Sequence, residues 1–265
     1  MITAEIYHSY GRLSGMGEIL IHHATVDHGD GRGTFCFPWN VLLGKISGGD
    51  GGTILDFRSG RLFHMYPEQL ILIPPNRRVS YDFIPGFRFV NLQFNFDFYH
   101  GFDHFEESKE CITLSSGKWC RHFLELLMQP CCYRTLVLLK AALLEFSLEL
   151  LPDIQPKELP EEMQELLQFI RRNLDARMSV KTLAEHCGMT PPAFSRKFSR
   201  FIGKSPKAYL DSQMMILLGT CLAGQQPLSK IAEKFHFSSE FHLSRFVHRL
   251  TGLAPSALRR RFANR

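Results

Sequence analysis

The C-terminal half of the chain contains one pattern twice, as LAEHCGMTPPAFSRKFSRFIGKSP at residues 183–206 and as IAEKFHFSSEFHLSRFVHRLTGLAP at residues 231–255. Each copy has an apolar residue followed by Ala, then a turn, then apolar residues four positions apart. The offset between the copies is 48 residues before the turn and 49 after it, so the second copy is one residue longer. Two short helices joined by a tight turn form a helix-turn-helix, whose second helix enters the major groove of DNA.

The second helix of each copy separates apolar residues from polar ones. Phe194 and Phe198, and likewise Leu243 and Val247, are expected to face the helical core. The outward residues are candidates for contacts with bases: Pro192, Ser195, Arg196, Glu240, Phe241, His242, Ser244 and Arg245. An arginine can donate two hydrogen bonds to guanine, whereas serine and histidine make single ones. The alternative role for Arg196 and Arg245 is an ion pair with a neighbouring helix.

The distribution of charge supports a polyanionic partner for this half only. Residues 1–160 carry 14 Lys and Arg against 18 Asp and Glu, whereas residues 161–265 carry 17 against 8. The net charges are therefore −4 and +9, and a basic domain of this kind attracts nucleic acid. Contacts with phosphate are expected from Lys181, Lys197, Lys204, Lys207 and Arg249.

Composition excludes several classes of protein. Apolar residues make up 45% of the 265 and charged residues 22%, which is ordinary globular usage and not that of disordered or fibrous chains. Seven cysteines without CxxC spacing argue against a disulfide framework and against a zinc site. Met1–Tyr10 lacks the features of an export signal, and the apolar stretch Leu136–Leu151 is interrupted by charges. We therefore expect a cytoplasmic protein without a membrane span.

The N-terminal half is predicted to be mainly β structure. Val41–Ile46 and Leu70–Ile73 are apolar runs bounded by turn residues, and Val90–Phe98 alternates apolar and polar residues with the period of a strand. A sandwich or a barrel fits this pattern. The polar residues of the alternating strand, Asn91, Gln93, Asn95 and Asp97, are expected to face solvent, with a ligand pocket as the alternative.

Helical periodicity begins near residue 118 and continues to residue 151. The segment from Leu136 is apolar nearly all round, so it should be buried in its own domain or against a second subunit. Three prolines in residues 152–160 indicate a linker. We predict an α+β chain with a β domain and helical dimerisation segment at 1–151, a linker at 152–160 and an all-α domain at 161–265. That last domain should hold seven helices, at about 161–174, 179–187, 191–201, 206–223, 227–235, 239–250 and 255–262.

The doubled motif resembles the AraC/XylS family of transcription regulators. The positions that carry the resemblance are Leu183-Ala184, Gly188-Met189, Phe194, Arg196, Phe198, Gly203, Pro206, Ile231-Ala232, Phe237, Leu243, Arg245, Gly252, Pro255 and Arg259. The chain departs from the family at His236, where glycine is usual because this turn position favours a positive φ, and at Met214 and Leu218 of the connecting helix. Gly219 is also unfavourable within that helix. The resemblance implies that the protein forms a homodimer and binds double-stranded DNA. It also implies RNA polymerase as a further partner.

The N-terminal half resembles the cupin-like sensor of the same family through Glu68–Asn76 and the strand 90–98. This resemblance implies a small-molecule effector, such as a sugar, in the barrel. Trp39, His64 and Tyr66 are the candidate pocket residues because of their approximate placement in that sensor. No cofactor and no catalytic residue are predicted.

Two other classes of protein fit the sequence less well than a regulator does. A cupin enzyme needs two histidines one residue apart on a strand, and no HxH occurs; His22 and His23 would point to opposite faces, and His28, His100 and His104 offer no such set. A DNA-repair methyl-acceptor protein with the same DNA-binding domain would need clustered cysteines upstream. Cys131-Cys132 is better explained by packing than by redox chemistry.

Overall fold

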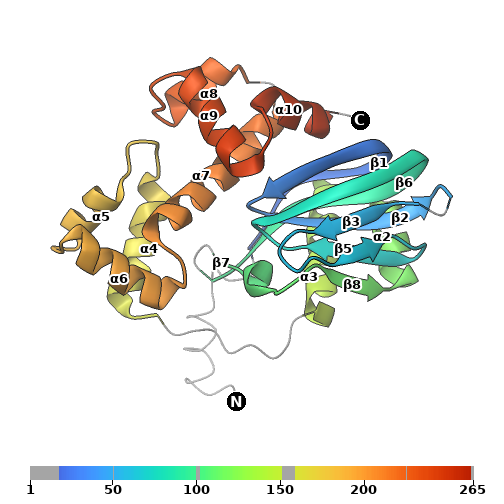
Figure 1. Ribbon diagram of the computed structural model, residues 1–265, viewed down its shortest axis with the longest axis horizontal. Helices are drawn as coiled ribbons and strands as arrows, with labels where there is room; N and C mark the ends of the chain where they lie inside the picture. Colours follow the sequence, from blue (N-terminus) through green and yellow to red (C-terminus); the bar gives the residue numbers. More distant parts are fainter. Residues whose placement is uncertain (1–17, 50, 100–101, 151–158, 225, 264–265) are drawn as a thin grey trace, which may run out of the picture.

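The computed structural model describes residues 18–49, 51–99, 102–150, 159–224 and 226–263. These residues form a curled antiparallel sheet and a helical domain that lies beside it (Figure 1). The strands are β1 Glu18–Phe37, β2 Asn40–Ser47, β3 Thr53–Asp56, β4 Leu62–His64, β5 Gln69–Ile73, β6 Arg77–Tyr99, β7 Phe102–Asp103 and β8 Ile112–Ser115. The predicted strands within residues 41–46, 70–73 and 90–98 are confirmed.

The sheet is organised around two long strands. The order of its main path is β4-β3-β6-β2-β5-β8, and β1 and β7 pair with β6 outside that path. β1 pairs antiparallel with β6 along almost its whole length, with register shifts between Ile21 and His23 and between Gly29 and Gly31. Such irregularities bend a strand and increase its twist, which curls the sheet into a half-barrel.

The two faces of the half-barrel have different partners because successive side chains of a strand point to opposite faces. Leu42, Leu92 and Phe94 on the outer face pack against α2 Gly117–Leu127 and α3 Tyr133–Leu150. Trp119, Phe123 and Phe146 are the fully buried aromatic residues of these helices. Val41 and Leu43 lie on the inner face with Phe35, Phe37 and Trp39. A 3-10 helix, η1 His104–Glu107, follows β7.

Residues 159–263, apart from residue 225, contain the seven predicted helices. Their bounds are α4 Glu161–Asn173, α5 Val180–His186, α6 Pro191–Ile202, α7 Pro206–Ala223, α8 Leu228–Lys234, α9 Glu240–Thr251 and α10 Pro255–Ala263. Ser179 and Ser205 cap α5 and α7 by accepting hydrogen bonds from the N–H groups of Thr182 and Ala208. The turns within the two copies have positive φ at Gly188 (62°) and at His236 (57°), so the turn conformation expected at His236 is confirmed.

The two helix-turn-helix units are packed differently. The first unit, α5 and α6, has a separate core built with α4. The core of the second unit, α8 and α9, continues through Met214, Met215 and Leu218 of α7 into the inner face of the half-barrel. The sheet therefore holds α7 and the second unit more directly than the first.

The predicted linker, residues 152–160, falls almost entirely outside the described residues, as do the N-terminal segment Met1–Tyr10 and His100. Leu159 is buried, and Pro160 directly precedes α4 at its N-cap position. Among the described helices, none is both long and apolar enough to cross a bilayer. All seven cysteines are free thiols.

Candidate nucleic-acid interface and effector cavities

The second helices of the two units, α6 and α9, present the polar faces that the repeat predicts. Phe194, Phe198 and Ile202 of α6 are buried, as are Leu243, Val247 and Thr251 of α9. The candidate base-contacting residues are exposed or half-buried: Pro192, Ser195, Arg196, Glu240, Phe241, His242, Ser244 and Arg245. The orientation of both recognition helices is thus as predicted.

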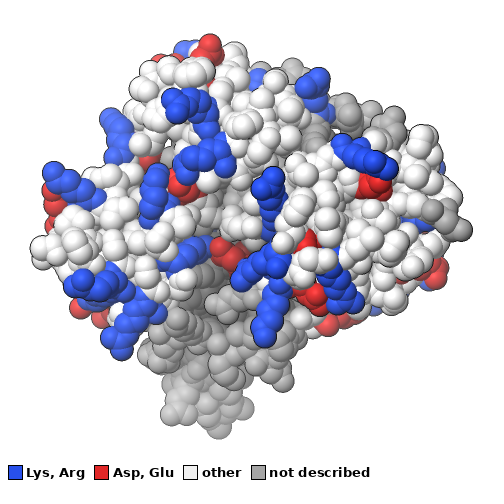
Figure 2. Space-filling model, viewed as in Figure 1, with Lys and Arg blue, Asp and Glu red and all other residues white. Residues whose placement is uncertain are grey.

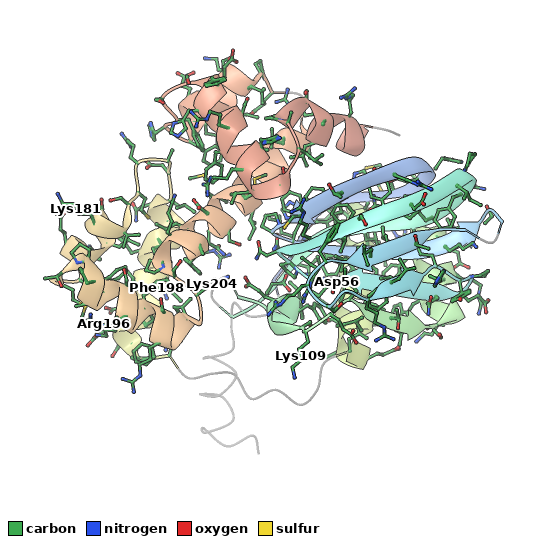
Figure 3. All side chains as sticks on the ribbon, viewed as in Figure 1. Asp56, Lys109, Lys181, Arg196, Phe198 and Lys204 are labelled. Carbon is green, nitrogen blue, oxygen red and sulfur yellow. The ribbon has the colours of Figure 1, made fainter. Side chains whose placement is uncertain are left out.

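Arg196 and Arg245 occupy equivalent positions in the two units, 49 residues apart. Arg196 lies at the outer edge of the first unit, as does Lys181, while Phe198 points into the unit (Figure 3). The guanidinium of Arg245 lies 5.9 Å from the centre of the Phe241 ring. Both arginines are exposed and available to an outside partner.

Most of the predicted phosphate contacts have an acidic neighbour within the helical domain. Lys197 pairs with Glu162, and Lys181 lies 3.8 Å from Glu185. Asp211 of α7 accepts hydrogen bonds from Lys207 at 2.8 Å and from Arg249 of α9 at 3.0 Å. Lys181, Lys207 and Arg249 keep more than half of their side-chain surface exposed, so these ion pairs leave them accessible to phosphate.

Lys204, a predicted phosphate contact, pairs with an acidic side chain of the sheet domain. Its ammonium nitrogen is 2.7 Å from both carboxylate oxygens of Glu106, in η1 of the sheet domain. The two side chains are only 17% and 21% exposed. Lys204 joins the two domains, and Figure 3 shows it on the side of the helical domain that faces the sheet.

Basic side chains are more numerous than acidic ones on the visible face of the helical domain (Figure 2). The same view shows further Lys and Arg along the seam with the sheet domain. A groove of about 590 Å³ runs beside α9 and is lined by His242, Arg245, His248 and Arg249, among others. This surface can attract a polyanion through long-range electrostatics.

The concave side of the half-barrel holds a cavity of about 430 Å³. Its apolar wall includes Phe35, Phe37, Val41, Leu43, Phe83 and Phe89. Asp27, His28, Tyr81, Asn91 and Gln93 supply polar groups. An apolar lining with a few convergent polar groups is typical of small-molecule sites.

Three polar residues of the alternating strand are buried, so their expected exposure to solvent was wrong: Asn91 and Gln93 line this cavity, and Asn95 lines the space between the two domains. Asn91, Gln93 and Asn95 are at most 9% exposed. Asn91 donates a hydrogen bond to Asp27 at 2.7 Å, and Gln93 donates to Asn91 at 3.4 Å. The helices α2 and α3 cover the apolar face of this part of β6. Both of its faces are therefore buried, and the polar side chains do not reach solvent. The side chain of Asp97 lies outside the described residues.

Of the predicted effector residues, only Trp39 lies near this cavity, and it does not line it. Trp39 is fully buried, and its indole N–H donates to Gln93 Oε1 at 3.0 Å. His64 and Tyr66 lie on and just after the short strand β4, where both are exposed, Tyr66 to 60%. Their rings contact each other at a centroid distance of 6.2 Å. The expectation that these two line a pocket was wrong, because strand β4 is at the edge of the sheet.

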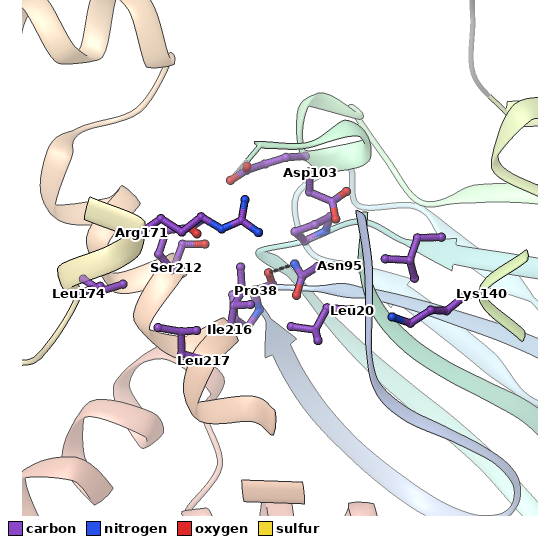
Figure 4. A pocket seen from close by; sticks show the side chains of 14 residues that line it. Leu20, Pro38, Asn95, Asp103, Lys140, Arg171, Leu174, Ser212, Ile216 and Leu217 are labelled. Carbon is purple, nitrogen blue, oxygen red and sulfur yellow. Dashed lines mark hydrogen bonds between the residues drawn. The ribbon is translucent and has the colours of Figure 1, made fainter. Parts of the chain in front are cut away.

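A second cavity, of about 320 Å³, lies between the two domains (Figure 4). Ile19, Leu20, Pro38 and Pro75 of the sheet domain face Leu174, Ile216 and Leu217 of the helical domain. Lys140 of α3 and Arg171 of α4 supply the basic groups of the lining, and Asp103 and Glu106 the acidic ones. Burial raises the pKa of Asp103 to about 7, against the opposing effect of hydrogen bonds from Phe96, Asn40 and Phe105.

His22 and Gly219 belong to the same seam and were not singled out as site residues from the sequence. His22 Nε2 donates to Asn95 Oδ1 at 2.6 Å, and its ring lies 4.4 Å from that of Trp39. Burial lowers the pKa of His22 to about 4, so the ring is neutral near pH 7. The sequence feature that could have indicated this contact is Gly219, because a glycine within a helix often marks a close approach of another element.

One comparison with known proteins concerns the helical domain. A family model described as "Helix-turn-helix domain" matches residues 183–261, which span both units. Two curated regulators also match part of the chain. Residues 183–261 are an AraC-type helix-turn-helix domain.

Both curated regulators are distant relatives of this chain. The "Uncharacterized HTH-type transcriptional regulator YidL" of Escherichia coli is 28% identical over 98 residues, 37% of this chain and 33% of that protein. The "MmsAB operon regulatory protein" of Pseudomonas aeruginosa is 25% identical over 126 residues, 47% of this chain and 41% of that protein. The matched region therefore spans between one third and about two fifths of the length of these relatives.

The whole fold also has a known counterpart. ToxT from Vibrio cholerae O395 superposes with a TM-score of 0.62 at 10% identity and covers 92% of this chain and 98% of its own. ToxT has also been solved with an unsaturated fatty acid bound, and that structure gives a TM-score of 0.59 at 11% identity, covering 90% of this chain and 93% of its own. At this identity the likeness establishes the fold: a half-barrel followed by a helical helix-turn-helix domain.

Proposed function

We propose that the chain is a transcription regulator that binds double-stranded DNA through α6 and α9 and responds to a small molecule. The observation that carries this proposal is the duplicated unit, with Arg196 and Arg245 exposed at equivalent positions of two recognition helices. Two such helices can read successive major-groove segments if they are held about one helical turn apart, ~34 Å. The N-terminal domain would then act by binding and not by catalysis.

The effector site that we propose is the cavity inside the half-barrel. Its combination of aromatic rings with Asn91, Gln93 and Asp27 suits a small polar metabolite such as a sugar, whose hydroxyl groups pair with amides while its ring faces stack on aromatic residues. Asn91→Leu should weaken binding of such a ligand, because it removes an amide that lines the cavity. A thermal-shift screen of sugars, with His64→Ala as a control on the exposed edge, tests this assignment.

A specific observation also favours a second ligand class. The cavity between the domains is largely apolar and has Lys140 and Arg171 in its lining, a combination that suits an amphiphile with an acidic head. ToxT has been solved with an unsaturated fatty acid bound. Adding fatty acids to the same thermal-shift screen, with Lys140→Met as the matched variant, separates the two cavities.

We further propose that the regulator is a homodimer joined through α3. This helix buries Leu139, Leu143 and Phe146 but leaves Val137, Leu144 and Leu148 exposed along one side. A two-fold dimer would cover this side and present two DNA-binding domains to paired half-sites. In this arrangement residues 1–151 form the sensing and dimerisation domain, 152–160 the linker and 161–265 the DNA-binding domain. RNA polymerase would be a further partner at the promoter.

The experiment that tests the proposed function is selection of duplexes from a random pool by the full chain. A regulator enriches one sequence pattern, and its affinity falls steeply with salt because bound phosphates release counterions. Absence of an enriched pattern at any salt concentration would contradict the proposal.

A further inference from the structure

Phe241 is a large apolar side chain on the outer face of a recognition helix. It is the second residue of α9 and is 69% exposed. Ser239 caps the helix by accepting a hydrogen bond from the N–H of His242, which fixes the turn that carries Phe241. The N-terminal residues of a recognition helix are those that reach base edges, yet a phenyl ring can pair neither with phosphate nor with a polar base edge.

Glu240 directly precedes Phe241, but the side chains that follow along the exposed face of α9 are basic and not apolar. Arg245, one helical turn later, holds its guanidinium 5.9 Å from the centre of the Phe241 ring, within the range of a cation–π contact. His248 and Arg249 follow along the groove beside α9. An apolar protein partner would have to desolvate these groups, whereas DNA neutralises them. The charge around the ring therefore favours DNA as its partner.

The major groove offers one apolar group at a base edge, the 5-methyl group of thymine. We propose that Phe241 packs against the 5-methyl group of a thymine while Arg245, held against the ring, contacts a guanine nearby. The inference rests on the proposed DNA-binding function and adds a specificity determinant to it. The equivalent residues of the first unit are Pro192 and Arg196, so that unit has the arginine but no aromatic ring. The two units would then read different bases although their frameworks repeat.

The test replaces thymine by deoxyuridine, which lacks only the 5-methyl group. The duplex that the full chain selects from a random pool is resynthesised with one thymine replaced at a time, and binding is measured by fluorescence anisotropy. One replacement should weaken binding of the wild-type chain about fourfold, the effect of one buried methyl group. Phe241→Ala should bind both duplexes equally, whereas Phe241→Leu should retain part of the difference. Phe57→Ala, which removes an exposed ring of the sheet domain, should retain all of it.

Several results would overturn the inference. It is wrong if Phe241→Ala keeps the full thymine preference, or if no thymine in the selected duplex is sensitive. It is also wrong if Phe241→Ala binds DNA like the wild type but loses self-association or association with RNA polymerase, because Phe241 would then contact protein. If the wild-type chain binds no duplex, DNA binding itself is contradicted and this inference falls with it. Circular dichroism of Phe241→Ala should match the wild type, because the ring is exposed.

Discussion

Gly219 of α7 lies against the indole of Trp39 in the sheet domain. A β-carbon at Gly219 would come within 2.9 Å of Trp39 Cζ3 and 3.0 Å of His22 Nδ1. Trp39 also donates a hydrogen bond to Gln93, which lines the half-barrel cavity. A chain of direct contacts thus leads from the proposed effector cavity to the helix that connects the two helix-turn-helix units.

Gly219→Ala sets the steric cost of this contact against the gain in helix propensity. Alanine favours a helix interior by about 1 kcal/mol over glycine, so a free α7 would be stabilised. Because Trp39 is fully buried and cannot move aside, we expect a net destabilisation of about 1–3 kcal/mol in chemical denaturation. Trp39→Leu makes room for the added methyl group, so Gly219→Ala should cost less in that background. Equal costs in both backgrounds would show that the two residues are not coupled.

Because Lys204 and Glu106 form an ion pair between the two domains, we expect substitutions at these residues to change the stability of the fold and not the binding of DNA. Lys204→Met and Glu106→Gln should each lower the free energy of unfolding by about 1 kcal/mol, because each removes one member of a largely buried ion pair. Lys204→Met should leave the slope of log affinity against log salt unchanged. The control is Lys181→Met, in which the removed cation is 78% exposed and should reduce the slope by about 1. A reduced slope in Lys204→Met would restore a phosphate role to this residue.

The buried His22 gives the fold a sensitivity to acid. Its pKa in the folded chain is lowered by burial to about 4, below the value near 6.5 expected when unfolded. The unfolded chain therefore takes up a proton first, so the contribution of His22 to stability is present above pH 6.5 and is lost as the pH falls towards 4. Asp103 acts in the opposite direction, because its pKa is raised to about 7 and its contribution is lost as the pH rises through that value.

The contribution of His22 is isolated by comparison with His22→Asn. The difference in the free energy of unfolding between the wild type and this variant should shrink as the pH falls from 6.5 to 4, while the Asp103 contribution cancels. A difference that does not change with pH would mean that His22 is charged, or accessible to protons, in the folded chain.

Charged residues introduced by substitution on the exposed side of α3 test the proposed dimer. Leu148 is 70% exposed, so Leu148→Glu should change the stability of a monomer by less than about 0.5 kcal/mol. In a dimer the same carboxylate would be desolvated without a partner. We expect sedimentation of the full chain at tens of micromolar to give a dimer for the wild type and for Leu62→Glu, an exposed control on β4, but a monomer for Leu148→Glu. Leu138→Glu should act in the same direction. A dimer that persists in both α3 variants would place the interface elsewhere.

The helical domain could be predicted almost completely from the sequence because its signals are local. Caps such as Ser179 and Ser205, prolines at first turns and apolar residues four positions apart each specify a boundary or a face without reference to distant segments. His236 could be recognised as a residue with positive φ because it stands where the first copy has Gly188. These signals repeat, and the repeat itself identified the recognition helices.

The effector site could not be predicted in the same way because it depends on long-range packing. The alternation in residues 90–98 identifies a strand with two different faces, but it does not say which face meets solvent. That the apolar face is covered by α2 and α3, and the polar face is turned inward, follows from the curl of the sheet. The pairing of Lys204 with Glu106 likewise joins residues 98 positions apart, and only the position of the domains reveals it.

The central claim is that the outer faces of α6 and α9 bind DNA, and one measurement tests it most directly. It is the affinity of the full chain, and of its Arg196→Ala and Arg245→Ala variants, for the selected duplex and for a random one. Each substitution should cost about 1–3 kcal/mol on the selected duplex and much less on random DNA, because a base contact carries specificity that a phosphate contact does not. Equal losses on both duplexes, or no loss on either, would contradict the claim.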